Sequence, residues 1–452
     1  MGRFAPSNKQ PSNIKVAVRN IVEQMPDALA EAALSAARSA GLSQRLTNKQ
    51  AAKYFRSYRI DLPAGYAARK VTIELGVPSL PGVRSFDFSD HVVAANGAAT
   101  DIVLLTTIGG FAISRDLGAS WKHFALKGQR GRRVHHAKWI GNDEVLLQTT
   151  VFEQTTHDRM VTNIVADAAT GKILSECVLE GSPWHSNRSV DVSASTIMYA
   201  EYPFEEPGLS RENLASARVF RSLDRGRTWK IVRAGDDVRH YHFLQVRPQG
   251  NGEWWLTSGD RPRESNIWKS RSNGDSWIRA SGPVRDRVQI GVADYPHTIY
   301  RLTDLTWFDK SVVWGTDDAL ASVRGGRPGP RMFRAPLGNL EKPVVVGRTN
   351  WAIRNIVDVG DHLLVLTQGS NRDQATDEQK KPGVYLMPKV PVAGSPKLVH
   401  LFNADVFSEI RTAFTYSRAS RAAKDGTFFT YRAPTDVFPS GSRILRWTVR
   451  FE

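Results

Sequence analysis

The spacing of apolar residues divides the chain into two parts near residue 57. In the first part, apolar positions recur at helical spacing over Ile14–Met25 and over the alanine-rich stretch from Pro26 to Gly41. In the second part, short runs of β-branched and aromatic residues alternate with glycine, proline and asparagine, a pattern typical of strands joined by turns. We therefore predict a helical N-terminal extension over residues 1–57 and an all-β domain over residues 58–452.

One short pattern recurs within the β-rich part. Ser222–Trp229 reads SLDRGRTW and Ser114–Trp121 reads SRDLGASW, so both have the form S-x-D-x-G-x-[ST]-W. A third copy, SRSNGDSW at Ser270–Trp277, keeps every position except the aspartate, which is Ser272. Serine and aspartate side chains bond to backbone amides in turns, glycine permits a positive φ, and tryptophan can be buried between layers. The copies therefore predict structural hairpin turns, formed by Ser114, Asp116, Gly118, Trp121, Ser222, Asp224, Gly226, Trp229, Ser270, Gly274 and Trp277.

This motif resembles the Asp box, also called the bacterial neuraminidase repeat, of sialidases and related β-propellers. The resemblance covers the three copies and the spacing between them, and it implies a propeller blade around each copy. It implies no single activity, because the box occurs in sialidases, other glycosidases, polysaccharide lyases, sorting receptors and a photosystem assembly factor.

The distance between glycine turns predicts the number of blades. Gly118, Gly171, Gly226 and Gly274 follow one another at intervals of 53, 55 and 48 residues, and each interval has the length of one four-stranded blade. Gly171 lies in a hairpin without the motif. Two further hairpins are expected near Gly338 and Gly394.

The last segment offers three strands, RTAFTY, GTFFTYRA and RILRWTVRF, and lacks a fourth. The unassigned stretch Lys70–Leu75 (KVTIEL) could supply it and thereby remove exposed sheet edges. We predict an all-β, seven-bladed β-propeller closed by pairing of residues 70–75 with the C-terminal blade. Six blades are the alternative.

Composition limits the class of protein. Hydrophobic residues make up 41% of the 452 residues, but no run of about 18 apolar residues could span a membrane, and the polar N-terminus lacks the core of a secretory signal. The single cysteine, Cys177, excludes an intramolecular disulfide and a structural zinc cluster. We expect a soluble protein, cytoplasmic or exported without a recognisable signal peptide, with no cofactor and no metal.

The net charge of +16, from 61 basic and 45 acidic residues, favours a polyanionic partner. The arginines are dispersed, and no nucleic-acid-binding motif accompanies them. We therefore expect an anionic carbohydrate as ligand and no specific nucleic acid. The N-terminal helices could also dock a protein partner.

Propeller topology predicts where a site would lie. The four strands of a blade run antiparallel outward from the axis, so the start of the first strand and the end of the second share one face, opposite the motif turns. Histidines, arginines, tyrosines and carboxylates gather at these positions. The candidates are His136 in blade 2, Glu201 and Tyr202 in blade 3, Arg239, His240, His242 and Asp260 in blade 4, Asp317 and Asp318 in blade 5, Arg354 in blade 6, and Arg411 and Arg432 in blade 7.

These candidates suit three functions. Glycoside hydrolysis needs a pair of carboxyl groups, which Asp260, Asp317 and Glu201 could supply, while arginines pair with a substrate carboxylate. In a polysaccharide lyase, a histidine or Tyr202 would instead remove a proton beside a uronic acid carboxylate, so His240 and His242 join the catalytic candidates. A propeller that binds a glycan or a protein without catalysis is the third.

The resemblance to sialidases would imply arginines that hold a substrate carboxylate. However, the Phe/Tyr-Arg-Ile-Pro signature of that family is matched only by YRIDLP (Tyr58–Pro63), in which Asp61 replaces the proline. A glycoside hydrolase acting on an anionic glycan is the leading hypothesis, ahead of the binding propeller and the lyase.

Overall fold

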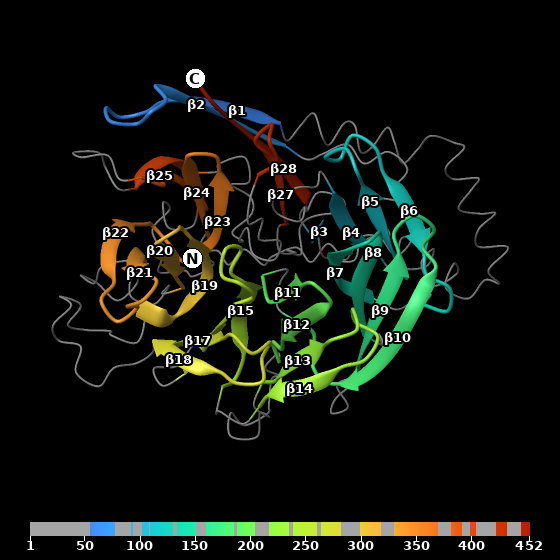
Figure 1. The fold of residues 1–452 in the computed structure, drawn as a ribbon. Coiled ribbons are helices and arrows are strands. Elements are labelled where there is room, and N and C mark those ends of the chain that lie inside the picture. The colour runs from blue at the N-terminus through green and yellow to red at the C-terminus, as the bar shows by residue number, and fades with distance from the viewer. Residues whose placement is uncertain are drawn as a thin grey trace, which may run out of the picture. The chain divides into compact units, whose positions relative to one another are not determined.

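The computed structural model describes residues 55–76, 92–93, 102–107, 109–129, 133–150, 160–184, 188–203, 217–234, 238–259, 264–281, 299–317, 330–368, 381–390, 398–403, 422–431 and 444–452. All of them lie in one compact unit, Gln50–Glu452. Their regular structure is almost entirely strand, so the all-β prediction is confirmed (Figure 1). The predicted N-terminal helices lie outside the described residues, except that Arg56 and Ser57 already belong to the first strand.

The strands form seven four-stranded antiparallel sheets, which correspond to the blades of a seven-bladed propeller. Blade 1 contains β3 (Val92–Val93), β4 (Val103–Thr107), β5 (Gly110–Ser114) and β6 (Lys122–Ala125). Blade 2 contains β7 (Arg133–Gly141), β8 (Glu144–Thr150), β9 (Met160–Asp167) and β10 (Ile173–Glu180). Blade 3 contains β11 (Val190–Ser193), β12 (Thr196–Ala200), β13 (Val219–Ser222) and β14 (Lys230–Arg233).

Blade 4 contains β15 (Tyr241–Val246), β16 (Trp254–Ser258), β17 (Asn266–Ser270) and β18 (Ile278–Ser281). Blade 5 contains β19 (Leu302–Trp307), β20 (Ser311–Thr316), β21 (Arg331–Pro336) and β22 (Val344–Arg348). Blade 6 contains β23 (Ile353–Val359), β24 (His362–Thr367), β25 (Gly383–Pro388) and β26 (Val399–Asn403). Blade 7 combines β1 (Arg56–Asp61) and β2 (Lys70–Gly76) with β27 (Thr427–Tyr431) and β28 (Ile444–Phe451).

Blade 7 joins the two ends of the domain, as the sequence predicted. β2 pairs with β28 in the register Val71↔Phe451 to Gly76↔Arg446. Among the described residues, the sheet takes two strands from each end of the domain: β1, which the sequence did not predict as a strand, lies outside β2 and pairs with it. The stretch RTAFTY, predicted as a strand of this blade, lies outside the described residues.

The hairpins predicted at Gly118, Gly171, Gly226, Gly274 and Gly338 are confirmed, because each joins the third and fourth strand of its sheet. In blade 6, β25 pairs with β26, and the turn predicted near Gly394 lies outside the described residues. Hydrophobic residues of neighbouring blades then pack against one another. Leu104 of blade 1 shares a cluster with Val134 of blade 2, and similar clusters join each later pair up to Leu364 of blade 6 with Trp447 of blade 7. β27 of blade 7 contacts β3 of blade 1. The core therefore consists of layers between blades.

The motif turns use their polar atoms locally. In the second copy, the Ser222 hydroxyl donates to Asp224 Oδ1 and accepts the Gly226 amide, both at 2.7 Å. Asp224 also accepts the Thr228 amide and hydroxyl at 2.8 and 2.6 Å, and Trp229 Nε1 donates to the Gly226 carbonyl at 3.0 Å. The first copy repeats these bonds with Ser114, Asp116, Gly118, Ser120 and Trp121.

The motif glycines also approach the preceding blade. Gly226 has a φ of +87°, and a Cβ on it would lie 3.0 Å from a methyl carbon of Val165 in blade 2. Gly274 of the third copy has the same φ, and its Cβ would lie 2.9 Å from the Met198 sulfur in blade 3. Each glycine thus serves both the turn and the contact between blades.

Candidate functional site

The candidate residues predicted from propeller topology fall into two groups. Asp260, Asp318, Arg411 and Arg432 lie outside the described residues. The other candidates are described and occupy the starts of first strands and the ends of second strands in blades 2 to 6, at His136, Glu201, Tyr202, Arg239, His240, His242, Asp317 and Arg354.

An aromatic stack links blades 3 and 4. The Tyr202 ring lies on the His240 ring at a centroid distance of 4.3 Å, and His240 lies 4.8 Å from His242. Both imidazoles are buried, whereas Tyr202 is partly exposed. His242 Nδ1 lies 3.0 Å from the Leu302 carbonyl of blade 5, and because a carbonyl can only accept, Nδ1 carries the proton.

A charged group links blades 5 and 6. Arg354 donates from Nη1 to Asp317 Oδ2 at 3.0 Å and from Nε to the Gln368 side-chain oxygen at 2.7 Å. Arg301, at the start of the first strand of blade 5, lies 3.7 Å from the same Asp317 oxygen. The Asp317 side chain is 7% exposed, while both arginine side chains keep about a fifth of their surface in contact with solvent. Part of each arginine side chain is therefore accessible to solvent.

These two groups are neighbours along one face. His242 bonds to the Leu302 carbonyl, and Leu302 directly follows Arg301, so the backbone at the start of β19 connects the aromatic stack with the charged group. Arg301 was not among the sequence candidates, although it occupies a position that the topological rule selects. Asp260 follows Gly259, whose amide donates to the His240 carbonyl at 3.2 Å. We call Tyr202, His240, His242, Arg301, Asp317 and Arg354 the face site.

Glu201 differs from the other candidates because both carboxylate oxygens are already engaged. Oε1 accepts from the Ser182 amide at 2.8 Å, and Oε2 accepts from the Arg218 amide at 2.7 Å. The Arg218 guanidinium adds a bidentate pair at 3.0 Å to each oxygen. A carboxylate with all four acceptor positions filled stabilises the fold, and its predicted role in proton transfer or nucleophilic attack gains no support from these contacts.

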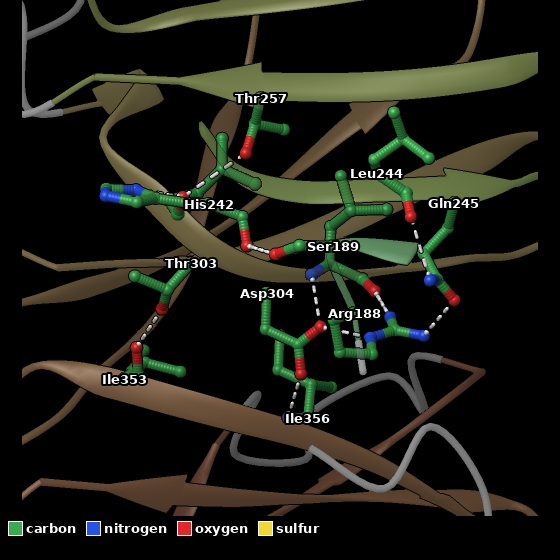
Figure 2. Close-up of polar contacts among 12 residues, drawn as sticks. Arg188, Ser189, His242, Leu244, Gln245, Thr257, Thr303, Asp304, Ile353 and Ile356 are labelled. Carbon is green, nitrogen blue, oxygen red and sulfur yellow. Dashed lines mark hydrogen bonds and ion pairs between the residues drawn. The ribbon is translucent and has the colours of Figure 1, made fainter. Parts of the chain in front are cut away.

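Sequence reasoning missed a buried ionic network among the inner strands (Figure 2). Arg188 Nε donates to Asp304 Oδ1 at 2.9 Å, so the pair joins blades 3 and 5, and Asp304 Oδ2 accepts the Ile356 amide of blade 6 at 2.8 Å. Arg188 also contacts Gln245 of blade 4 at 3.3 Å. One arginine–aspartate pair thereby connects four successive blades.

Side chain-to-carbonyl bonds repeat around the same region. Ser189 donates to the His242 carbonyl at 3.0 Å, and Thr303 donates to the Ile353 carbonyl at 2.8 Å (Figure 2). The His242–Leu302 bond lies between them in the series. His242 therefore has a structural task between blades 4 and 5, and this bond fixes its ring orientation at the face site.

Among the described residues, no group of three or more His, Cys, Asp or Glu side chains is placed to hold a metal ion. Within the same part of the chain, no helix has the length and apolar character needed to cross a membrane.

Comparison with known proteins gives similarity in structure but not in sequence. No family model matches the chain, and no curated protein matches it. The chain is similar to the solved structure of YCF48 bound to a D1 peptide, with a TM-score of 0.46 and 11% identity over 86% of this chain and 97% of that one. An oligogalacturonate lyase in complex with manganese gives a TM-score of 0.46 and 11% identity over 88% and 96%. The WD40 β-propeller domain of Doa1 gives 0.45 and 11% over 80% and 94%. At these identities, no function is transferred from these proteins.

Proposed function

We propose that this chain is a β-propeller that binds an anionic carbohydrate at the face site. The observation that carries the proposal is the meeting of the Tyr202–His240–His242 stack with the Arg301–Asp317–Arg354 group. An aromatic surface suits the apolar face of a sugar ring, and guanidinium groups pair with carboxylates. The net charge of +16 adds a long-range attraction for the same ligand class.

Binding is favoured over hydrolysis by the state of the described carboxylates. Glu201 is saturated by Arg218 and two backbone amides, and Asp317 is paired with Arg354. Glycoside hydrolysis remains the competing proposal, with Asp260 and Asp317 as the pair. It requires carboxyl groups about 5–5.5 Å apart for retention, or about 6.5–9.5 Å apart for inversion.

The test is calorimetric titration of the full chain with carboxylated oligosaccharides and with their neutral counterparts at low and high salt. We expect binding of the carboxylated set only. Arg354→Gln and Arg301→Gln should each weaken binding about 10-fold or more, because each removes a charge-assisted hydrogen bond to the ligand.

The matched control is Arg271→Gln, which removes a well-exposed arginine from the third motif copy on the opposite face. It should leave the affinity unchanged apart from a small electrostatic effect. The proposal fails if no carboxylated oligosaccharide binds, or if Arg271→Gln weakens binding as much as the two face-site variants.

The same samples separate a binder from a hydrolase. Release of new reducing ends by the natural chain, together with its loss in both Asp260→Asn and Asp317→Asn while binding persists, would establish the hydrolase. A chain that binds without any release of reducing ends supports the binding propeller.

A further inference from the structure

Among the described sheets, blade 7 alone takes strands from both ends of the domain. Its two ends are held to each other by backbone bonds: β2 pairs with β28, and the Arg69 and Lys70 amides donate to the Glu452 carbonyl at 2.8 and 3.0 Å. These bonds do not attach the ends to the rest of the domain. That attachment depends on side chains that pack blade 7 against blade 6, as Leu364 and Trp447 do.

His362 lies in this contact between blades 6 and 7. It is the first residue of β24, directly after the turn that follows β23, and it is 4% exposed. Its ring is stacked with the Tyr66 ring at a centroid distance of 5.6 Å and with the Phe451 ring at 4.5 Å. Tyr66 lies between β1 and β2, whereas Phe451 ends β28. One histidine of blade 6 therefore contacts an aromatic residue from each end of the domain.

The protonation state of His362 affects this contact. Its Nδ1 atom is buried and has no hydrogen-bond partner in the described part of the chain. A neutral imidazole can leave Nδ1 unprotonated, whereas an imidazolium carries a proton on both nitrogens. The faces of the Tyr66 and Phe451 rings would attract that cation, but a ring face does not replace the acceptor that a buried charged donor requires. The buried position therefore suits the neutral ring.

Two charged groups act on the ring in opposite directions. Asp361 favours the protonated form, whereas Lys389, whose ammonium group lies 2.6 Å from Asp358, disfavours it. Burial has the largest influence and lowers the pKa of His362 from its usual 6.5. Burial also raises the pKa of Tyr66 to about 12, so the phenol stays neutral when the imidazole titrates.

The charged residues beside Phe451 face away from the imidazole. Arg450 and Glu452 flank Phe451 in the chain, and side chains alternate between the two faces of a strand. Arg450 pairs with Glu74 at 3.2 Å, and Glu452 pairs with Arg59 at 2.5 Å. These ion pairs lie on the other face of the sheet and provide no counter-charge for an imidazolium.

We propose that His362 is a pH-sensitive latch on blade 7: the neutral ring holds both ends of the domain against blade 6, and protonation at mildly acidic pH loosens them. Because the pKa in the folded state lies below the ordinary value of 6.5, the stabilisation is complete above about pH 6.5 and is lost as the pH falls below it. The latch does not depend on the proposed function, since it adjoins a turn on the face opposite the face site.

The test is hydrogen–deuterium exchange of the full chain, followed by mass spectrometry at about pH 7.5 and about pH 5.5, with labelling times adjusted for the intrinsic pH dependence of exchange. Amides of residues 66–76 and 444–452 should lose protection by up to about 10-fold at the lower pH, because it lies about one unit below the ordinary pKa of histidine. An unchanged protection of both segments would overturn the latch.

Two variants assign the effect to one side chain. His362→Phe keeps an aromatic ring that cannot be protonated, so the loss of protection at low pH should disappear. His400→Gln is the matched control, since His400 is an exposed histidine on β26 of the same blade, and its removal should leave the loss unchanged. The latch is refuted if His362→Phe still loses protection at low pH, or if His400→Gln abolishes the loss.

A second measurement needs no substitution of His362 and therefore does not depend on the folding of His362→Phe. The imidazole of the natural chain is titrated by NMR, with its signals assigned by their proximity to the Tyr66 and Phe451 rings. The midpoint should lie below pH 6.5, and Lys389→Gln should raise it because it removes the opposing cation. A midpoint at or above pH 6.5 would show that attraction to the rings outweighs burial, and the latch would be wrong.

Discussion

The second motif copy and the face site are both rich in polar side chains, yet they are assembled in opposite ways. In the motif copy, Asp224 reaches its partners within four residues along the chain. In the face site, Arg354 and Asp317 are 37 residues apart, and Arg188 and Asp304 behind it are 116 apart. Local bonds can form as soon as a turn forms, whereas the distant pairs need the blades to be in place first.

Because the Arg188–Asp304 pair connects distant segments, we expect its loss to destabilise the whole domain. Asp304→Ala should lower the free energy of unfolding by about 3–5 kcal/mol, because it leaves the buried Arg188 guanidinium without its counter-charge. Chemical denaturation measures this loss. Replacing both partners, as in Arg188→Met with Asp304→Leu, should restore part of the stability. If Asp304→Ala lowered the free energy of unfolding less than the motif variant Asp224→Ala does, the contrast between long-range and local bonds would be contradicted.

Breaking a motif copy should have a smaller and more local effect. Asp224→Ala removes several hydrogen bonds within one turn and should lower the free energy of unfolding by about 0.5–2 kcal/mol. Ligand binding should survive in the folded protein, since the motif lies at the opposite ends of the strands from the face site. A fully folded Asp224→Ala chain that no longer binds would show that the motif takes part in function.

Low pH should reduce the stabilisation that a motif copy with an aspartate contributes to folding. Burial raises the pKa of Asp224, but hydrogen bonds from Thr228, Ser222 and Arg227 outweigh it and lower the pKa from 3.8 to about 2. Because the folded pKa lies below the unfolded one, this stabilisation is complete above the unfolded pKa and is lost as the pH falls from about 4 towards 2.

Asp224→Ser, which copies Ser272 of the third motif, should remove that part of the pH dependence. Unfolding by denaturant at a series of pH values measures it. If the free energy of unfolding of the natural chain and of Asp224→Ser changed in parallel between about pH 4 and 2, Asp224 would not be the source of this pH dependence. The third copy provides the precedent, because Ser272 accepts the Ser276 amide at 2.9 Å without a charge.

The smallest effect concerns backbone strain in the turns. Leu117 has a φ of +54°, which asparagine tolerates better than leucine, and the third copy has Asn273 at the equivalent position with a φ of +50°. Leu117→Asn should therefore raise the free energy of unfolding by about 0.5 kcal/mol. Leu117→Ala is the control, because it shortens the side chain without relieving the strain. If Leu117→Asn and Leu117→Ala were equally stable, the gain would come from removing the leucine side chain and the prediction of relieved backbone strain would be wrong.

The sequence by itself determined the repeating unit. Turn glycines at 118, 171, 226 and 274 and the alternation of apolar residues fixed the hairpins, and the count of seven blades followed from their spacing. These signals are local, since a turn depends on the residues within it and strand alternation depends on neighbours two positions apart. The rule that relates strand ends to one face selected both Asp317 and Arg354, and the structure shows these two residues as an ion pair.

Only the tertiary structure decided which distant segments pair. The sequence analysis assigned no strand to residues 56–61, yet they form β1, which pairs with β2 in blade 7. Arg188 and Asp304 likewise carry no mark in the sequence that distinguishes them from the other charged residues. Their pairing depends on the stacking of whole blades, which brings together side chains far apart in the chain and excludes water from between them.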